Sequence, residues 1–219
     1  MKKGYLFIGL LTVLSFTVTG IFLIFTPDKI PAHYNAAGEV DRMGSKFEYL
    51  LFPIASALIG GLMALLAKTR KAGSTDENIL LITGIASQLV FQALSVYFLY
   101  KAVTYDETIA VNASGAYKLS SILLGSLLAI MGNIMPKARR NFIFGMRTKW
   151  SLSNDAVWQK SQRFAGFTSV ACGIGMIVST IFTSGIFCLA ISIVLILLWS
   201  LLCAIQSYRY YRIVKGDQS

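Results

Sequence analysis

Residues 164–208 contain no Asp, Glu, Lys or Arg, and this uncharged stretch restricts the possible folds more than any other part of the chain. A helix rises about 1.5 Å per residue and needs about 20 apolar residues to cross about 30 Å of hydrocarbon. The stretch is roughly twice that length, so we expect it to hold two helices. Thr183, Ser184 and Gly185 form the turn-favouring cluster near its middle, which predicts a tight turn there.

Four further apolar runs are each long enough to cross a membrane: residues 5–25, 50–67, 79–100 and 119–135. With 55% hydrophobic and 14% charged residues, the chain is also more apolar than an ordinary soluble domain. The sequence therefore predicts an all-α integral membrane protein with six transmembrane helices. The first run is too long for a cleaved signal peptide and has no convincing cleavage site after it, so we expect a retained span.

Positive charges are distributed unevenly between the two sides that six spans would create. If the N-terminus is inside, only five of the 20 Lys and Arg residues lie outside, namely Lys29, Arg42, Lys46, Lys101 and Lys118. Cytoplasmic segments of membrane proteins carry an excess of Lys and Arg, so we expect both termini to be cytoplasmic. The net charge of +10 is then a topology signal that also favours anionic lipid headgroups, rather than a sign of direct nucleic-acid binding.

The spans and polar segments divide the chain into two predicted regions. Residues 1–71 hold the first two spans and an extracellular loop at 27–48. Residues 72–219 hold four further spans and a cytoplasmic loop at 136–163.

The predicted extracellular loop contains a polar segment at residues 30–46. Pro fixes one backbone angle and Gly permits unusual ones, so Pro31 and Gly38 favour a compact folded loop. His33 is the sole histidine and is close in sequence to two carboxylates. This pattern fits a metal site or a proton-responsive pair, but a lone His with irregularly spaced carboxylates is more often a hydrogen-bonded loop residue. The candidate recognition residues are Pro31, His33, Asn35, Gly38, Asp41 and Lys46.

A second polar segment, residues 145–158, lies between two apolar runs in the predicted cytoplasmic loop. Ser151 and Ser153 are favourable N-cap residues. Asp155 would then lie in the first turn, near the positive end of the dipole of a helix that continues into the fifth span.

Aromatic and basic side chains in the same segment give two interpretations. The indoles of Trp150 and Trp158 suit the headgroup level, which indicates an interfacial helix that seats the fifth span. Arg147, beside Gly145, instead favours a binding role, because a guanidinium could hold exposed carbonyls of the fourth span or a partner's carboxylate. The inner candidate residues are Asn133, Gly145, Arg147, Thr148, Trp150, Ser151 and Trp158.

Small and amide side chains mark the interior of the predicted spans. Series with the small-xxx-small spacing of packed membrane helices occur at Ser56 and Gly60, at Ser121, Gly125 and Ala129, and at Ala165, Ser169 and Gly173. Gln88 and Gln92 share a helix face and could line a small polar cavity. A transport pathway normally carries ionisable groups at membrane depth, and the predicted spans have none, which argues against a proton-coupled pump.

Two motifs carry a family resemblance. The outer segment reads Ile-Pro-x-His-x-Asn-x-x-Gly-x-x-Asp-x-x-Gly-x-Lys and resembles the N-terminal domain of unknown function of SdpI-type proteins. The inner segment reads Gly-x-Arg-Thr-x-Trp-Ser-Leu-x-x-x-x-Val-Trp and resembles the C-terminal signature of the same family. The likeness extends over nearly the whole chain, although Lys149 stands where family members often have Pro.

The resemblance implies a six-span immunity and signal-transduction protein of the bacterial plasma membrane, which protects a cell from its own secreted peptide toxin. We expect the outer loop to engage this toxin and the inner loop to dock a cytoplasmic repressor. An enzyme is disfavoured because an acyl-transfer nucleophile needs a nearby base, and no cofactor or metal is expected. The alternatives are a small-solute or peptide transporter or exporter, and a structural membrane protein without a ligand.

Overall fold

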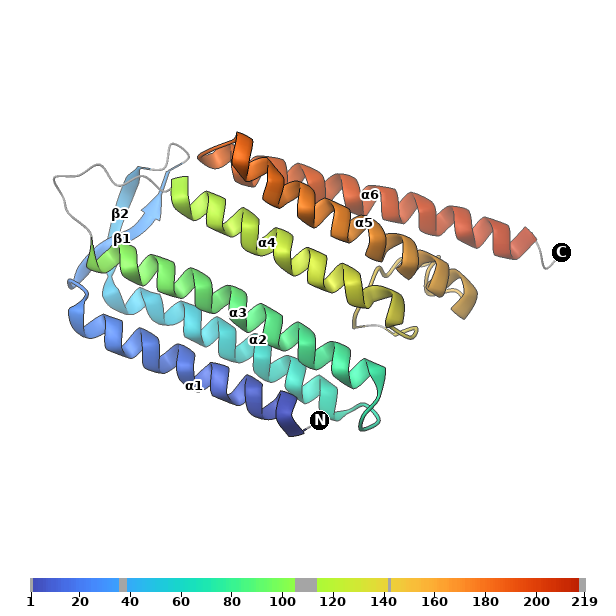
Figure 1. Ribbon diagram of the computed structural model, residues 1–219, viewed down its shortest axis with the longest axis horizontal. Coiled ribbons are helices and arrows are strands. Elements are labelled where there is room, and N and C mark those ends of the chain that lie inside the picture. The colour runs from blue at the N-terminus through green and yellow to red at the C-terminus, as the bar shows by residue number, and fades with distance from the viewer. Residues whose placement is uncertain (1, 36–38, 105–113, 142, 217–219) are drawn as a thin grey trace.

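The computed structural model describes residues 2–35, 39–104, 114–141 and 143–216. Six of its helices are long and apolar enough to cross a membrane. They are α1 (Lys2–Phe25), α2 (Leu51–Lys68), α3 (Thr75–Val103), α4 (Ser114–Ile134), α5 (Asp155–Phe182) and α6 (Ile186–Gly216). This confirms the six predicted spans. Both termini lie at the same end of the bundle (Figure 1), and their cytoplasmic location stays a prediction.

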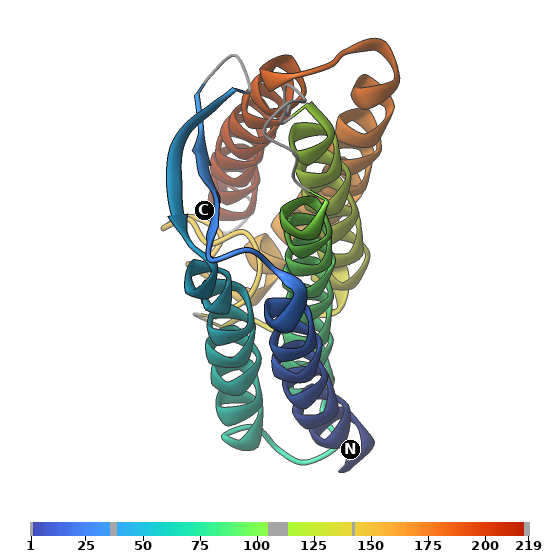
Figure 2. The ribbon, with the colours of Figure 1, turned by 90° about the vertical axis from the view of Figure 1, so that its left-hand side faces the viewer.

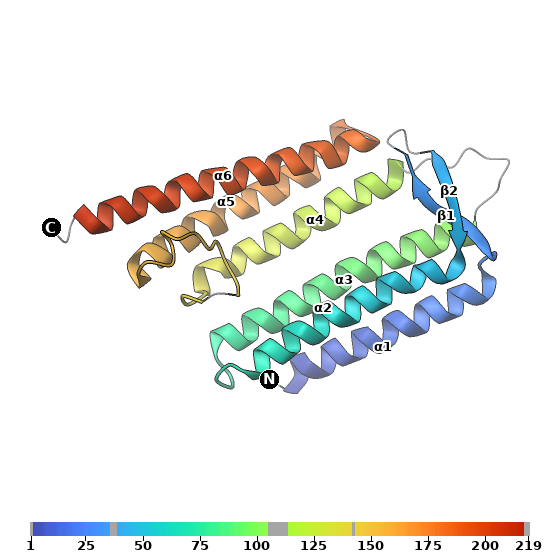
Figure 3. The same ribbon diagram turned by 180° about the vertical axis from the view of Figure 1, so that it is seen from behind.

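The helices form two groups of three. α1, α2 and α3 pack together, as do α4, α5 and α6, and the main helix contact between the groups joins α3 to α4. Figures 1 and 3 show the two groups as separate layers of roughly parallel rods. We call these groups the first half and the second half. The two regions predicted from the sequence, which divide the chain at residue 71, stay a prediction.

The described chain is mostly helical, as predicted, but it also contains an antiparallel β-hairpin between α1 and α2 that the all-α prediction did not include. Its strands are β1 (Lys29–Tyr34) and β2 (Val40–Ser45), and their register shifts on either side of His33. The hairpin stands over one end of the bundle (Figure 2), which we call the hairpin end. The opposite end holds both termini and the connection between the second half's first two helices, and we call it the loop end.

A short 3-10 helix, η1 (Lys46–Leu50), leads from β2 into α2. Ser45 begins it with a capping box: its side chain accepts the backbone N–H of Phe47, and its own backbone N–H donates to Glu48. Such a box satisfies backbone donors at a helix start that would otherwise be unpaired. The hairpin is therefore joined to α2 without a loose linker.

The turn predicted inside the uncharged stretch is confirmed. α5 ends at Phe182 and α6 begins at Ile186. Gly185 adopts φ +61°, a left-handed conformation that side chains disfavour, and it lies in open space. The two long helices can therefore reverse direction within a few residues.

α4 and α5 approach each other closely along the predicted small-residue seam. A Cβ atom on Gly125 would lie 2.6 Å from the carbonyl oxygen of Gly173, so only glycine fits there. Ser169 Oγ also donates a hydrogen bond of 2.8 Å to the carbonyl of Leu128. Close backbone approach is how membrane helices gain packing energy, and the predicted seam is confirmed.

The outward faces of the helices carry large apolar side chains. Ile24, Phe167 and Phe182 are 76%, 78% and 81% exposed, respectively. A soluble protein rarely exposes so much apolar surface, whereas lipid covers it at no cost. The chain is therefore a multi-pass membrane protein.

Polar side chains tie the first half together inside. Gln88 is 1% exposed, and its Nε2 donates to Thr12 Oγ1 on α1 at 2.8 Å and to the carbonyl of Ser56 on α2 at 3.5 Å. Gln88 thus joins the three helices at one level. The small cavity predicted beside Gln88 and Gln92 stays a prediction.

Candidate functional site

Side-chain pairs fix the shape of the hairpin. His33 Nδ1 lies 2.6 Å from Asp41 Oδ1, and this exposed pair bridges β1 and β2. The interpretation of His33 as a hydrogen-bonded residue is therefore confirmed. Within the described residues, no group of three or more His, Cys, Asp and Glu side chains is arranged to hold a metal ion.

Asn35 closes the tip of the hairpin and connects it to the second half. Its Nδ2 donates to Glu39 Oε2 at 3.0 Å, and its Oδ1 accepts the backbone N–H of Glu39 at 3.0 Å. Tyr117 on α4 donates its hydroxyl to the carbonyl of Asn35 at 3.1 Å. Gly38, the other candidate at this tip, lies outside the described residues.

Ion pairs close the base of the hairpin. Lys46 Nζ lies 2.9 Å from Asp28 Oδ1, and its backbone N–H donates to the carbonyl of Asp28 at 3.1 Å. Arg42 makes two hydrogen bonds, of 3.2 and 2.8 Å, to the carboxylate of Glu48. A two-point contact of this kind fixes orientation as well as distance.

A buried apolar contact attaches the hairpin to the helices. Ile30 is 1% exposed and packs against Tyr49, Leu99 and Ala102. The hydroxyl of Tyr49 also donates to the carbonyl of Pro31 at 3.4 Å. The hairpin is therefore seated on η1 and the end of α3 rather than projecting freely into solvent.

A cavity of about 430 Å³ lies beneath the hairpin, between the two halves. Tyr and Phe side chains from β1, η1, α2, α3 and α4 line it, together with aliphatic side chains such as Leu189 of α6. The aromatic residues are Tyr34, Tyr49, Phe52, Phe98 and Tyr117. Polar groups of His33, Arg42 and Glu48 also line it. An apolar interior with a few fixed polar groups is the usual form of a ligand site.

Sequence reasoning missed the aromatic walls of this cavity. Tyr49 and Phe52 are three residues apart on one face at the start of the second span, and Phe98 and Tyr117 lie near the ends of the next two. Clustering of aromatic residues at one level of the spans was the available signal. The same pattern is typical of an ordinary membrane-interface belt, so it could not have identified a cavity.

At the loop end, a connection of residues 138–154 follows η2 (Met135–Lys137) and leads to α5. Gln162 on α5 holds this connection: its Oε1 accepts the backbone N–H of Met146 and its Nε2 donates to the carbonyl of Met146, both at 2.9 Å. Gly145 has φ +105°, and a Cβ atom there would lie 2.5 Å from Gln162 Oε1. The predicted Gly145 is thus required by the fold.

Thr148 and Ser151 form a second hydrogen-bonded unit in the connection. Each side chain accepts the other's backbone N–H at 2.9 Å, and Ser151 Oγ donates to the carbonyl of Met146 at 2.9 Å. Thr148 Oγ1 lies 2.6 Å from Ser207 Oγ on α6. These contacts attach the connection to the last helix as well as to α5.

The predicted interfacial anchor role of Trp158 is wrong. Its side chain is 1% exposed, and its Nε1–H donates to the carbonyl of Ala138 at 2.8 Å. It packs with Ile79 of α3 and Ile134 of α4. Because α5 begins only three residues earlier, the indole points into the folded connection and finds its hydrogen-bond partner there rather than at the membrane surface.

The predicted helix start is also corrected. The N-cap of α5 is Asn154, whose Oδ1 accepts the backbone N–H of Val157 at 2.9 Å. The hydroxyl of Ser151 instead bonds backbone groups of Met146 and Thr148, and the hydroxyl of Ser153 donates to the carbonyl of Trp150 at 2.7 Å. Asp155 does lie in the first turn, as predicted. The segment before it forms turns instead of the predicted interfacial helix.

Other predicted inner residues lie at the surface. Trp150 packs against Tyr208 of α6, with ring centroids 5.0 Å apart, and Lys149 Nζ lies 5.1 Å from the centroid of the indole. Arg147 is exposed on the connection, and Asn133 is exposed on α4. The connection therefore presents basic and aromatic groups on a hydrogen-bonded base.

The connection also joins the two halves. Ile143 packs against a buried cluster of the first half that includes Ile8, Leu80 and Leu81. Sequence reasoning missed both Gln162 and Asn141, whose Oδ1 accepts the backbone N–H groups of Ile143 and Phe144. A Gln or Asn beside a polar loop gives no sign of which backbone groups it will satisfy.

These features define a class: a six-span membrane protein with a folded hairpin over a cavity at one end and a hydrogen-bonded connection at the other. Comparison with known families gives two matches. Residues 10–56 match a domain of unknown function (DUF1648), and residues 137–205 match the SdpI/YfhL protein family. The second match covers the connection, α5 and part of α6, so this part of the chain is similar to the SdpI/YfhL family.

A full-length relative extends this similarity over the whole chain. The chain is 25% identical over 218 residues to "Immunity protein SdpI" of Bacillus subtilis (strain 168), and the match covers 100% of both chains. No solved structure matches the chain. The two family matches include the hairpin and the connection, which are the parts of the chain that the span prediction leaves unexplained.

Proposed function

We propose that this chain is an immunity protein that binds a secreted antimicrobial peptide at the hairpin end. The observation that carries the proposal is the aromatic cavity of about 430 Å³ between the hairpin and the ends of both halves. The full-length relative is named an immunity protein, which supports a protective role, and the peptide class of the ligand is what the motif resemblance implies. Occupying this cavity would keep a membrane-active peptide from inserting elsewhere in the bilayer.

The chemistry of the cavity suits an amphipathic peptide. An apolar side chain would lie against Tyr49, Phe52 and Phe98, where aromatic contacts contribute beyond the area they bury. The polar groups of Arg42 and Glu48 would then orient the peptide's own charged or backbone groups. The apolar contacts would supply affinity, and the polar contacts would fix the orientation of the peptide.

The second part of the proposal is that the connection docks a cytoplasmic repressor. Exposed Arg147 and Lys149 lie on a segment that Gln162 and Ser151 hold in one conformation. A preorganised surface loses little entropy on binding, which favours a protein partner. The repressor would be recruited to the membrane surface through contacts with the connection.

The proposal requires the hairpin end to face outside. A cysteine replacing exposed Ser184 should react with a membrane-impermeant thiol reagent in intact cells, and one replacing exposed Ser153 should react only after lysis. The background carries Cys172→Ala, because Cys188 and Cys203 are buried. Labelling of the Ser153 variant before lysis would reverse the topology and remove the basis of the proposal.

Filling the cavity tests the binding site directly. Ser120 is half-buried and lines the cavity, so Ser120→Trp should abolish protection in a deletion strain challenged with toxin-containing culture supernatant. The control is Ser126→Trp, the same change on the same helix away from this cavity. Protein abundance in the membrane fraction is measured for both. Full protection by the Ser120 variant would exclude the cavity.

A labelled peptide separates binding from the alternative of export. An immunity protein that binds its ligand should raise the amount of peptide bound at the cell surface, whereas an exporter should lower the amount associated with the cell. The comparison uses wild-type, Ser120→Trp and deletion strains. Reduced peptide in the wild-type strain would favour the exporter.

A further inference from the structure

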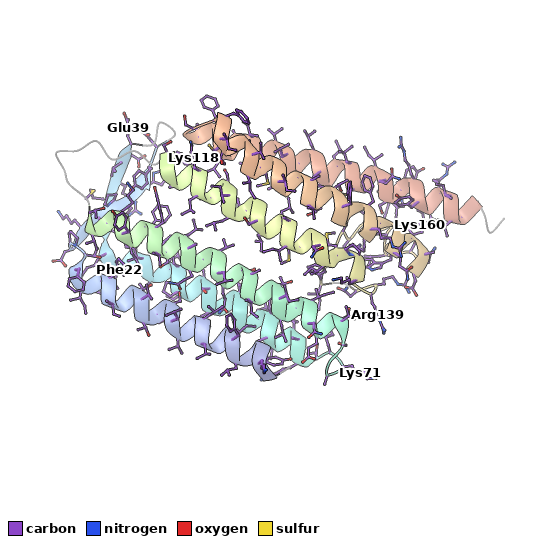
Figure 4. All side chains as sticks on the ribbon, viewed as in Figure 1. Phe22, Glu39, Lys71, Lys118, Arg139 and Lys160 are labelled. Carbon is purple, nitrogen blue, oxygen red and sulfur yellow. The ribbon has the colours of Figure 1, made fainter. Side chains whose placement is uncertain are left out.

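A cleft lies at the loop end, beside the start of the connection. It has a volume of about 560 Å³ and lies where the end of α4, with η2, meets the first turns of α5. Its polar lining consists of Lys137, Arg139, Arg140, Asp155, Gln159 and Arg163. Figure 4 places Arg139 at the same end of the molecule as Lys71 and Lys160.

The cleft carries unbalanced positive charge. Arg140 is neutralised, because its Nε lies 2.8 Å from Asp155 Oδ1. Lys137, Arg139 and Arg163 are exposed and form no ion pair with any of the residues that the structure describes. Three cations that face one cleft repel each other, and a bound anion would remove that repulsion.

The cleft also lies where the uncharged stretch begins, because Arg163 is the last charged residue before residues 164–208. On α5, Arg163 shares a face with Phe167 and Ile174, which are four and 11 residues further along the helix. These two side chains are 78% and 53% exposed, in a helix that is long and apolar enough to span the membrane. A molecule seated in the cleft would therefore continue along an apolar surface toward the centre of the bilayer.

We propose that this cleft binds the headgroup phosphate of an anionic phospholipid. The guanidinium groups of Arg139 and Arg163 match phosphate oxygens, and Lys137 adds a third positive charge. A zwitterionic headgroup brings its own cation and so leaves the charge of the cleft uncompensated. The acyl chains lie along Phe167 and Ile174. An acidic protein segment would balance the charge but would leave this apolar surface unused.

This inference does not depend on the proposed immunity function. The bound lipid fixes the junction between α4 and α5 at the membrane surface, from which the 138–154 connection extends. Basic pockets between spans on the cytoplasmic side are known to suit anionic headgroups. The lipid is thus a structural ligand of the loop end.

The test uses the purified full-length chain in detergent and native mass spectrometry. Phosphatidylglycerol and phosphatidylcholine with identical acyl chains are titrated separately, and inorganic phosphate and a poly-glutamate peptide are added in further arms. The variants are Arg163→Gln and Lys160→Gln. Lys160 is an exposed cation on the same helix that does not line the cleft, so the two variants lose the same charge.

Phosphatidylglycerol should bind the wild-type chain in preference to phosphatidylcholine. Arg163→Gln should weaken that binding about fivefold, whereas Lys160→Gln should change it by less than about twofold. Equal losses in both variants, or equal binding of the two lipids, would overturn the proposal. Displacement of the lipid by inorganic phosphate alone would indicate a simple anion site, and preferential binding of poly-glutamate would indicate an acidic protein partner. Thermal unfolding confirms that both variants are folded.

Discussion

The hairpin end and the loop end of this protein are both polar, yet they are built differently. The hairpin is shaped by exposed pairs between side chains, such as His33 with Asp41 and Arg42 with Glu48. The connection is shaped by side chains that satisfy backbone groups, such as Gln162 with Met146 and Trp158 with Ala138. Exposed ion pairs contribute little stability, whereas buried backbone groups are costly to leave unpaired.

This difference separates recognition from folding. Surface residues at the hairpin end can change with little effect on the fold, and the cavity beneath them is open to a ligand. The buried side chains that hold the connection cannot change in this way, because they satisfy its backbone groups. Variants at the two ends should therefore differ in how protection and stability are lost.

The largest expected effect is at Trp158. Trp158→Ala should destabilise the protein by about 3–5 kcal/mol, because it removes a fully buried indole and leaves the carbonyl of Ala138 without its donor. Thermal unfolding in detergent and abundance in the membrane fraction give the readout. Trp150→Ala, at a half-buried tryptophan of the same connection, should cost clearly less. Similar losses of stability in the two variants would show that burial of Trp158 is not what makes it the more important of the two.

A smaller effect is expected at Gln162. Gln162→Ala should cost about 1–3 kcal/mol, since the backbone N–H of Met146 loses its acceptor. The matched control is Gln159→Ala, an exposed glutamine on the same helix, which should change stability by less than about 0.5 kcal/mol. Chemical unfolding measures both. If the two glutamines proved equivalent, the backbone contacts of Gln162 would not be what holds the connection.

The smallest effect on stability is expected at the hairpin. His33→Ala should change stability by less than about 1 kcal/mol, because the pair with Asp41 is exposed. It should nevertheless lower protection, since His33 lines the cavity. Lys29→Ala on the same strand is the control and should protect normally. Survival assays and unfolding curves on both variants test this, and a large loss of stability in His33→Ala would remove the distinction between the two ends.

The helices could be predicted from the sequence more completely than the polar segments. The length of the uncharged stretch predicted two spans, its turn-favouring cluster predicted where they reverse, and the turn lies at Thr183–Gly185 as predicted. The β-hairpin could not be predicted, because β1 reads Lys-Ile-Pro-Ala-His-Tyr and lacks the alternation of a typical strand. Burial of Ile30 anchors it and cross-strand pairs set its shape, and both are tertiary contacts that single-sequence reasoning does not contain.

The start of α5 shows a similar limit. Ser151, Ser153 and Asn154 are all good N-cap residues, so local preference could not choose among them. Other contacts decide which of them caps the helix. The hydroxyl of Ser151 donates to the carbonyl of Met146, and that of Ser153 donates to the carbonyl of Trp150, so Asn154 is left to cap α5. The cavity was missed for a related reason, because its walls come from segments far apart in the chain.

The length of α6 makes bilayer thickness part of the structure of the loop end. Its uncharged part, residues 186–208, would span about 34 Å, a little more than the roughly 30 Å of hydrocarbon, so it fits with a modest tilt. Ser207 and Tyr208, which contact Thr148 and Trp150, lie at the end of this part. A thinner membrane would tilt α6 further, and the support of the connection would move with it.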